Sequence, residues 1–105
     1  MANRLNTNPI YIDIFNADVT IAKKGVPVTI TKIVMLSAAD GDIFRLEDEA
    51  GNRLVHMVNL GAADTQTEDF NGKGLRCNSG LAIDVSDCTG MAAVDGTDAV
   101  WIYTT

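Results

Sequence analysis

Apolar and polar positions alternate on both sides of a turn between residues 42 and 60, DIFRLEDEAGNRLVHMVNL. Alternation with a period of two is typical of β-strands, because successive side chains point to opposite faces of a sheet. The central residues 49–52 include a glycine and an asparagine, which tolerate a positive φ angle. The segment therefore predicts a β-hairpin and an all-β fold class.

Both faces of the second strand of this hairpin carry apolar side chains. One face holds Val55 and Met57, and the other holds Leu54, His56, Val58 and Leu60. A strand with a solvent face does not need apolar residues on both sides. We therefore expect one face to pack in the core and the other against a neighbouring subunit, with His56 in that contact.

Five more runs rich in β-branched and aromatic residues predict strands, at residues 10–15, 19–21, 26–37, 81–85 and 99–103. A turn is expected between the second and third of these, at residues 23–25. Residues 61–80 are rich in glycine and predict loops with at most short strands, at 67–70 and 75–77. No window combines helical periodicity with capping residues.

Short strands with turn signals every 8–12 residues or so are typical of a sandwich or barrel. We expect a single small antiparallel β-sandwich or jelly-roll-like barrel of about seven to eight strands, formed by residues 10–105. Residues 1–9 hold three asparagines and end at a proline, and we expect a flexible N-terminal arm there. The run 26–37 becomes apolar on both faces after Lys32, which predicts a central strand or one whose outer face is covered.

The charge and composition of the chain argue against several classes of function. The net charge is −6, from 14 acidic and 8 basic residues, which argues against binding a nucleic-acid backbone. No apolar run approaches the roughly 18 residues of a membrane span, and the N-terminus does not resemble a secretory signal. Cys77 and Cys88 are expected to be buried free thiols, with a disulfide across adjacent strands as the alternative.

Catalytic residue types do not form a recognisable set. His56 is the only histidine and lacks a local nucleophile motif, so we do not expect an enzyme. Calcium binding is an alternative, because acids flank two loops at Asp84, Asp87, Asp95 and Asp98 and at Asp40 and Asp42. Aspartate is also a common turn residue, and the spacing of residues 95–98, DGTD, does not match a twelve-residue calcium loop. We therefore expect no metal and no cofactor.

From residue 42 onward the motifs resemble those of small virion proteins of tailed bacteriophages. The resemblance covers roughly residues 30–103 and lies in the segments GDIFRLEDEAGN (41–52), GLAIDVSDCTG (80–90) and AVWIY (99–103). It implies a β-sandwich structural protein, often a capsid decoration (cement) protein that acts as a trimer, and it implies no catalytic residues.

We therefore expect a structural virion protein on the capsid surface, assembled in the host cytoplasm, that self-associates as a trimer and stabilises the shell of the major capsid protein. No direct contact with nucleic acid or membrane is expected. The alternatives are a component of the head–tail junction, tail or fibre, and a carbohydrate- or calcium-binding β module. The expected interface residues are Leu5, Pro9, Tyr11, Val55, His56, Met57, Trp101 and Tyr103.

Overall fold

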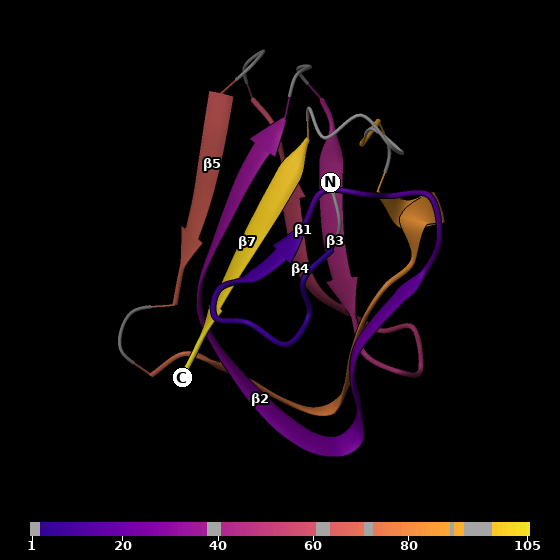
Figure 1. Cartoon of the computed structure of the whole chain (residues 1–105), viewed down its shortest axis with the longest axis vertical. Coiled ribbons are helices and arrows are strands. Elements are labelled where there is room, and N and C mark those ends of the chain that lie inside the picture. Colours follow the sequence, from indigo (N-terminus) through magenta and orange to yellow (C-terminus); the bar gives the residue numbers. More distant parts are fainter. Residues whose placement is uncertain (1–2, 38–40, 61–63, 71–72, 89, 92–97) are drawn as a thin grey trace.

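The longest element of the fold is strand β2, Val19–Ser37, which spans 19 residues and curves through the molecule (Figure 1). The computed structural model describes residues 3–37, 41–60, 64–70, 73–88, 90–91 and 98–105. The other elements are the strands β1 Ile10–Ile12, β3 Ile43–Glu47, β4 Arg53–Val58, β5 Asp64–Asp69, β6 Leu75–Ile83 and β7 Ala99–Thr104, and the 3₁₀-helix η1 Val85–Asp87.

All seven described strands belong to one hydrogen-bonded antiparallel sheet, with the order β1-β7-β2-β6-β3-β4 and with β5 also on β2. β5 and β6 follow one another along one edge of β2, pairing with residues 32–37 and 19–30, respectively. β7 pairs with the other edge of β2, from Ile30 to Leu36. One strand therefore connects every part of the sheet.

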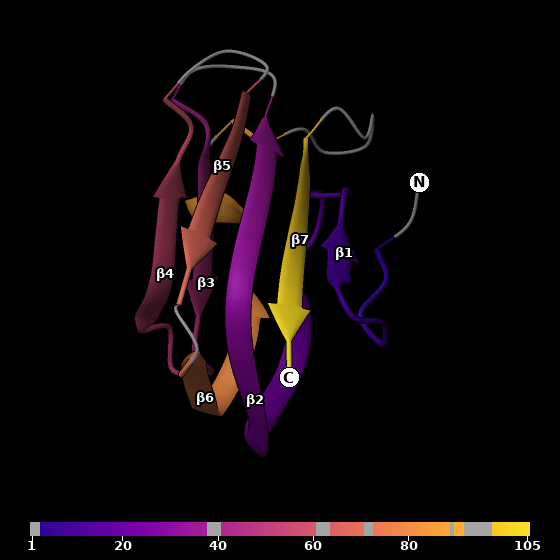
Figure 2. The same cartoon turned by 90° about the vertical axis from the view of Figure 1, so that its left-hand side faces the viewer.

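The sheet folds over on itself along β2 and encloses the core. Its pairing with β6 shifts register twice, and Gly25 lies in the second shift with a φ of 93°. Figure 2 shows β3 and β4 on one side of the molecule and β7 and β1 on the other. Across the interior, the rings of Phe15 and Phe44 meet edge to face with centroids 6.4 Å apart. Such contacts between segments far apart in the chain fill the space between the two layers.

Buried and more exposed side chains alternate along the strands, and the buried ones form the core. On β7, Val100 and Ile102 are fully buried whereas Trp101 and Tyr103 are only half-buried. The largest fully buried apolar side chains are Phe44, Ile12, Ile30, Ile33, Met35, Leu46, Leu81, Ile83, Ile102 and Val100. They come from β1, β2, β3, β6 and β7, so every layer of the fold contributes to one core.

The all-β class, the strand number and the hairpin are confirmed. β3 and β4 pair antiparallel, with Phe44 opposite Met57 and Leu46 opposite Val55. The layers are parts of a single bent sheet, where the sequence led us to expect a β-sandwich or a jelly-roll-like barrel.

Two predicted interruptions were wrong. The expected turn at residues 23–25 lies within β2, because the register shifts there absorb the irregular residues without ending the strand. In residues 61–80 the short strands expected at 67–70 and 75–77 are present but longer, as β5 and β6, and Gly80, with a φ of 94°, lies inside β6 where a loop was expected. Glycine marks a strand irregularity in both places, and turn signals alone do not distinguish the two cases.

The described part of the N-terminal segment, residues 3–9, runs back along the domain. Arg4 and Tyr11 exchange two backbone hydrogen bonds of 2.8 and 2.9 Å. The Asn3 side chain accepts hydrogen bonds from the amides of Asp13 and Ile14, both at 3.0 Å. The Asn8 side chain donates to the carbonyl of Thr104 and accepts from its amide. These contacts attach residues 3–9 to β1 and β7, and the flexibility of residues 1–9 stays a prediction.

The two cysteines are buried free thiols, as expected. Burial raises the pKa of Cys77, and it raises the pKa of Cys88 to about 11. The Cys88 thiol donates a hydrogen bond of 3.8 Å to the carbonyl of Arg45, so it takes part in packing the 3₁₀ segment against β3.

Candidate interaction surfaces

Large apolar side chains occupy the outer surface of the layer formed by β1, β7 and the second half of β2. Each has at least one buried, inward-pointing neighbour in the sequence, so these residues point outward. Each of them is half-buried. We call this set the aromatic face: Tyr11, Val34, Leu36, Trp101 and Tyr103.

Strand register places the aromatic face in rows across the sheet. Tyr11 lies opposite Trp101, and Trp101 lies opposite Val34, which gives one continuous row across three strands. In the next row, Tyr103 lies opposite Lys32. Backbone pairing of the three strands fixes the positions of these rows relative to one another.

Two cations rest on the rings of this face. The Arg4 guanidinium carbon lies 5.4 Å from the centroid of the Tyr11 ring, and the Lys32 Nζ lies 4.6 Å from that of Tyr103. Both distances are within the range of a cation–π contact. Burial and the nearby Asp13 raise the pKa of Tyr11, so its phenol is neutral at physiological pH. The face therefore combines a neutral aromatic surface with positive charges in a protein whose net charge is −6.

A small cavity of about 290 Å³ opens beside the aromatic face. It is lined by Arg4, Thr7, Asn8, Pro9, Tyr11 and Trp101. Thr7 donates a hydrogen bond of 2.8 Å to the carbonyl of Pro9, and the Asn8 side chain is bonded to Thr104. Polar groups of the N-terminal segment thus form part of the wall of this cavity.

A second apolar surface lies on β4. Val55 and Met57 point into the core, whereas His56 and Val58 point outward. Val58 is 37% exposed, and Leu60, just beyond the strand, is 78% exposed. We call the exposed set the β4 strip: His56, Val58 and Leu60. Leu54 is half-buried and packs against the core. Contiguous exposed apolar residues on a sheet are a common mark of a protein contact.

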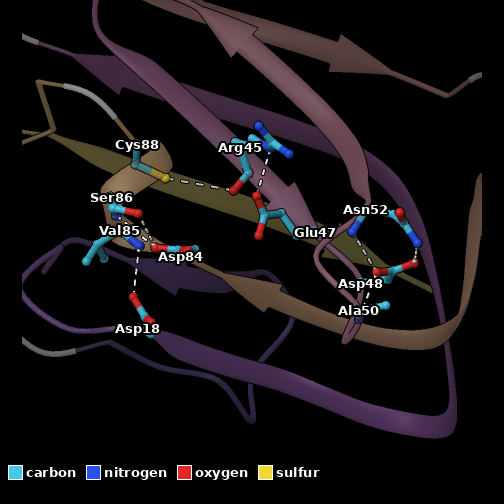
Figure 3. Close-up of polar contacts among 10 residues, drawn as sticks. All are labelled: Asp18, Arg45, Glu47, Asp48, Ala50, Asn52, Asp84, Val85, Ser86 and Cys88. Atoms are coloured by element: carbon cyan, nitrogen blue, oxygen red, sulfur yellow. Dashed lines mark hydrogen bonds and ion pairs between the residues drawn. The ribbon is translucent and has the colours of Figure 1, made fainter.

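A polar cluster attaches η1 to β3 (Figure 3). The carboxylates of Glu47, Asp84 and Asp87 lie within 4.8 Å of one another. The Arg45 Nε lies 2.8 Å from the Glu47 Oε2. A hydrogen bond with Asp87, together with burial, raises the pKa of Glu47. The cluster therefore places Glu47 between the Arg45 guanidinium, which favours its charged form, and Asp87, which favours its neutral form.

The rest of this cluster consists of helix-capping contacts. The Asp84 Oδ1 accepts hydrogen bonds from the Ser86 amide at 3.0 Å and from its hydroxyl at 2.6 Å, and these bonds lower the pKa of Asp84. The Val85 amide donates to the Asp18 carboxylate at 3.1 Å. Because donors of the same chain already engage these carboxylates, the arrangement acts as a structural clamp.

Of the acids proposed for calcium, the four that the structure describes do not form one site. Asp84 and Asp87 lie with Glu47, which no sequence signal indicated because it comes from the distant hairpin. Asp42 is buried and accepts a hydrogen bond from Ser37. Asp98 is buried. Asp40 and Asp95 lie outside the described residues.

The structure separates the expected interface residues into groups. Pro9, Tyr11 and Trp101 line one cavity, and Tyr103 lies on the same face. His56 is exposed on the β4 strip. Val55 and Met57 fill the core of their own chain, and Leu5 packs against that core. Val34 and Leu36 were not among the expected interface residues, although the two-faced apolar pattern of residues 26–37 was the signal for them.

Comparisons with known proteins add no relative: no family model, no curated protein and no solved structure matches this chain. The resemblance to phage virion proteins therefore rests on the sequence motifs alone. Among the described residues, no helix is long and apolar enough to cross a membrane.

Proposed function

We propose that this chain is a structural virion protein, a capsid decoration protein that self-associates as a trimer and binds the major capsid protein of a tailed phage. The aromatic face carries the proposal. Its five large side chains stay half-buried on the outside of a layer whose inner side is already packed. Tryptophan and tyrosine are enriched at the centres of protein interfaces, where they contribute most of the binding energy.

The chemistry of the face suits a protein surface as its partner. A partner's apolar groups would cover Trp101, Val34 and Leu36, and its carboxylates would meet Arg4 and Lys32. Because Arg4 and Lys32 are already positioned against aromatic rings, little side-chain entropy is lost on docking. The sequence motifs shared with phage virion proteins support the same class of partner.

The protein would stabilise the shell by adding contact area between capsid subunits. A stable interface buries about 1,200–2,000 Å² in total, and a symmetric shell repeats that gain at every equivalent position. A rigid domain that contacts adjacent capsid subunits adds buried area that must be lost before those subunits can separate. It therefore opposes expansion of the shell by the pressure of packaged DNA.

Co-sedimentation with expanded capsids of the encoding phage tests the proposal. We expect the wild-type protein to bind, and Trp101→Ala to weaken binding about 30-fold, the loss typical of a hot-spot residue. Val26→Ala is the matched control, because Val26 is 53% exposed and lies away from the aromatic face. Circular dichroism establishes that each variant is folded.

A wild-type protein that is monomeric and does not bind expanded capsids would contradict the proposal. Electron microscopy with labelled protein distinguishes the related roles by position. Label spread over the shell supports decoration, and label confined to the head–tail junction or the tail replaces it with the other structural role.

A further inference from the structure

Arg4 contributes a positive charge to the wall of the cavity beside the aromatic face. The cavity has a volume of about 290 Å³ and lies between the N-terminal segment and the rings of Tyr11 and Trp101. Figure 2 shows this segment turning back beside β1. Within the described part of the chain the ion pair is that of Arg45 with Glu47, and the guanidinium of Arg4 contacts the Tyr11 ring. Its N–H donors are therefore available to an anion that enters the cavity.

The other polar side chains of the cavity wall already make hydrogen bonds within the chain. The Thr7 hydroxyl donates to the carbonyl of Pro9 at 2.8 Å. The Asn8 side chain donates to the carbonyl of Thr104 at 2.8 Å and accepts from its amide at 3.0 Å. Recognition of the hydroxyl groups of a sugar takes several donors and acceptors, whereas a carboxylate is bound by a single guanidinium fork. The wall therefore favours an anion over a neutral polar ligand.

The apolar part of the wall fits the stem of a side chain. Tyr11 and Trp101 form an aromatic pair, and Pro9 adds a further apolar surface. Pockets for whole small ligands have volumes of about 300–1,000 Å³, so this cavity suits a group no larger than one side chain. A glutamate or aspartate combines an apolar stem with a terminal carboxylate. A phosphate has no such stem, and the net charge of −6 disfavours a polyanion.

We infer that this cavity receives one acidic side chain, a glutamate or an aspartate, of the major capsid protein. The inference rests on the proposed function and identifies the contact by which the aromatic face selects its partner. The carboxylate pairs with the Arg4 guanidinium, and the stem packs against Trp101 and Pro9. The docked partner excludes water from this pair, so its charges are screened less than those of a surface ion pair.

Variants of Arg4 test the contact by co-sedimentation with expanded capsids. Arg4→Gln should weaken binding roughly 30-fold, as expected when one partner of an interfacial charge pair is removed. Arg4→Lys keeps the charge without the guanidinium fork, so its binding should be intermediate. Lys24→Gln is the matched control, because it removes a positive charge from an exposed residue in the first half of β2, away from the aromatic face. It should change binding by less than about twofold.

A small carboxylate tests the cavity in the free protein. Ac-Glu-NH₂ and Ac-Gln-NH₂ differ only in the side-chain carboxylate. Trp101 lines the cavity and is the only tryptophan of the chain, so its emission reports binding. We expect Ac-Glu-NH₂ to change this emission with saturation in the millimolar range, because it has a single anchoring group. Ac-Gln-NH₂ should have no effect, and Arg4→Gln should abolish the response to Ac-Glu-NH₂.

The two experiments separate this inference from the proposed function. A wild-type protein that responds to Ac-Glu-NH₂ but does not bind capsids overturns the capsid role and leaves the preference of the cavity for a carboxylate in place. Capsid binding that Arg4→Gln does not weaken overturns the inference and leaves the capsid role. Equal weakening by Lys24→Gln also overturns it, because general electrostatic attraction would then explain the loss. Equal responses to the two blocked residues, or a response to glucose in their place, would overturn it as well.

Discussion

Tyr11 and Trp101 face each other across the β1–β7 pair, with ring centroids 5.4 Å apart and ring planes inclined at 52°. This tilted arrangement covers one side of the indole with a ring that itself supports the Arg4 guanidinium. Trp101 is the only tryptophan of the chain, so its fluorescence reports the state of the aromatic face.

Removing the Tyr11 ring should expose Trp101. In the free protein we expect Tyr11→Ala to shift tryptophan emission to longer wavelength and to increase quenching by acrylamide. The aromatic contact is worth about 1 kcal/mol beyond its buried area, so the unfolding free energy should fall by at least that amount. Val26→Ala should leave the emission unchanged. Unaltered quenching in Tyr11→Ala would mean that the two rings are not in contact in solution.

Phe44 should be among the most costly residues to truncate. It is fully buried and meets Phe15 across the two layers. Phe44→Ala removes a large side chain from a packed core, so we expect a loss of about 3–5 kcal/mol in unfolding free energy from urea denaturation. Val26→Ala should change it by less than about 0.5 kcal/mol. A loss below 1 kcal/mol or so for Phe44→Ala would show that the layers are not packed as described.

Two glycines allow backbone strain to be separated from crowding. Gly51 and Gly80 have similar positive φ angles of 88° and 94°. An added Cβ meets nothing within 4 Å at Gly51, whereas at Gly80 it would lie 2.9 Å from the Glu49 Cβ. We expect Gly51→Ala to cost about 1–2 kcal/mol from backbone strain alone. Gly80→Ala should cost at least about 1 kcal/mol more, because β6 or the hairpin must also move. Equal losses in thermal or urea denaturation would contradict this difference.

The clamp between β3 and η1 should weaken as the pH rises. The hydrogen bond with Asp87 and burial raise the pKa of Glu47 above its ordinary value of 4.5. A raised folded-state pKa stabilises the fold fully below 4.5, and this contribution is lost as the pH rises through the raised value. Glu47→Gln keeps a donor toward Asp87 and cannot ionise. The stability difference between wild type and Glu47→Gln should therefore change over that pH window, and a constant difference would contradict the assignment.

Asp48 should show the opposite dependence. Hydrogen bonds from Asn52 and Ala50 lower the pKa of this carboxylate below 3.8. A lowered folded-state pKa contributes stability above 3.8, which is lost as the pH falls through the lowered value. Asp48→Ala should therefore reduce the loss of stability on acidification, as measured by urea denaturation at successive pH values. An identical acid profile for the two proteins would be the contrary result.

The hairpin and the outward residues of β7 were predictable because strict alternation determines which side of a strand each residue faces. Trp101 and Tyr103 alternate with the buried Val100 and Ile102, so their shared outer face follows from the sequence. On β4 the same alternation was clear, but it could not distinguish the core side from the outer side because both are apolar. The structure resolves this by placing Val55 and Met57 inside.

What the sequence could not indicate depends on contacts between distant segments. Glu47 joins Asp84 and Asp87 only because β3 lies beside the end of β6, where Glu47 is paired with Ala82. The continuity of β2 through residues 23–25 depends on β6 as its partner, and a local Lys-Lys-Gly pattern has the same appearance in a turn.

The length of β2 also has a consequence for how the chain folds. Its first half pairs with β6, and its second half pairs with β5 and β7, so Ile30 has Leu75 on one side and Thr104 on the other. None of these partners precedes β2 in the chain. On the ribosome, β2 would emerge early and wait with both edges unpaired until segments far downstream have been synthesised. High contact order of this kind slows folding, and it leaves an apolar strand open to aggregation in the interval.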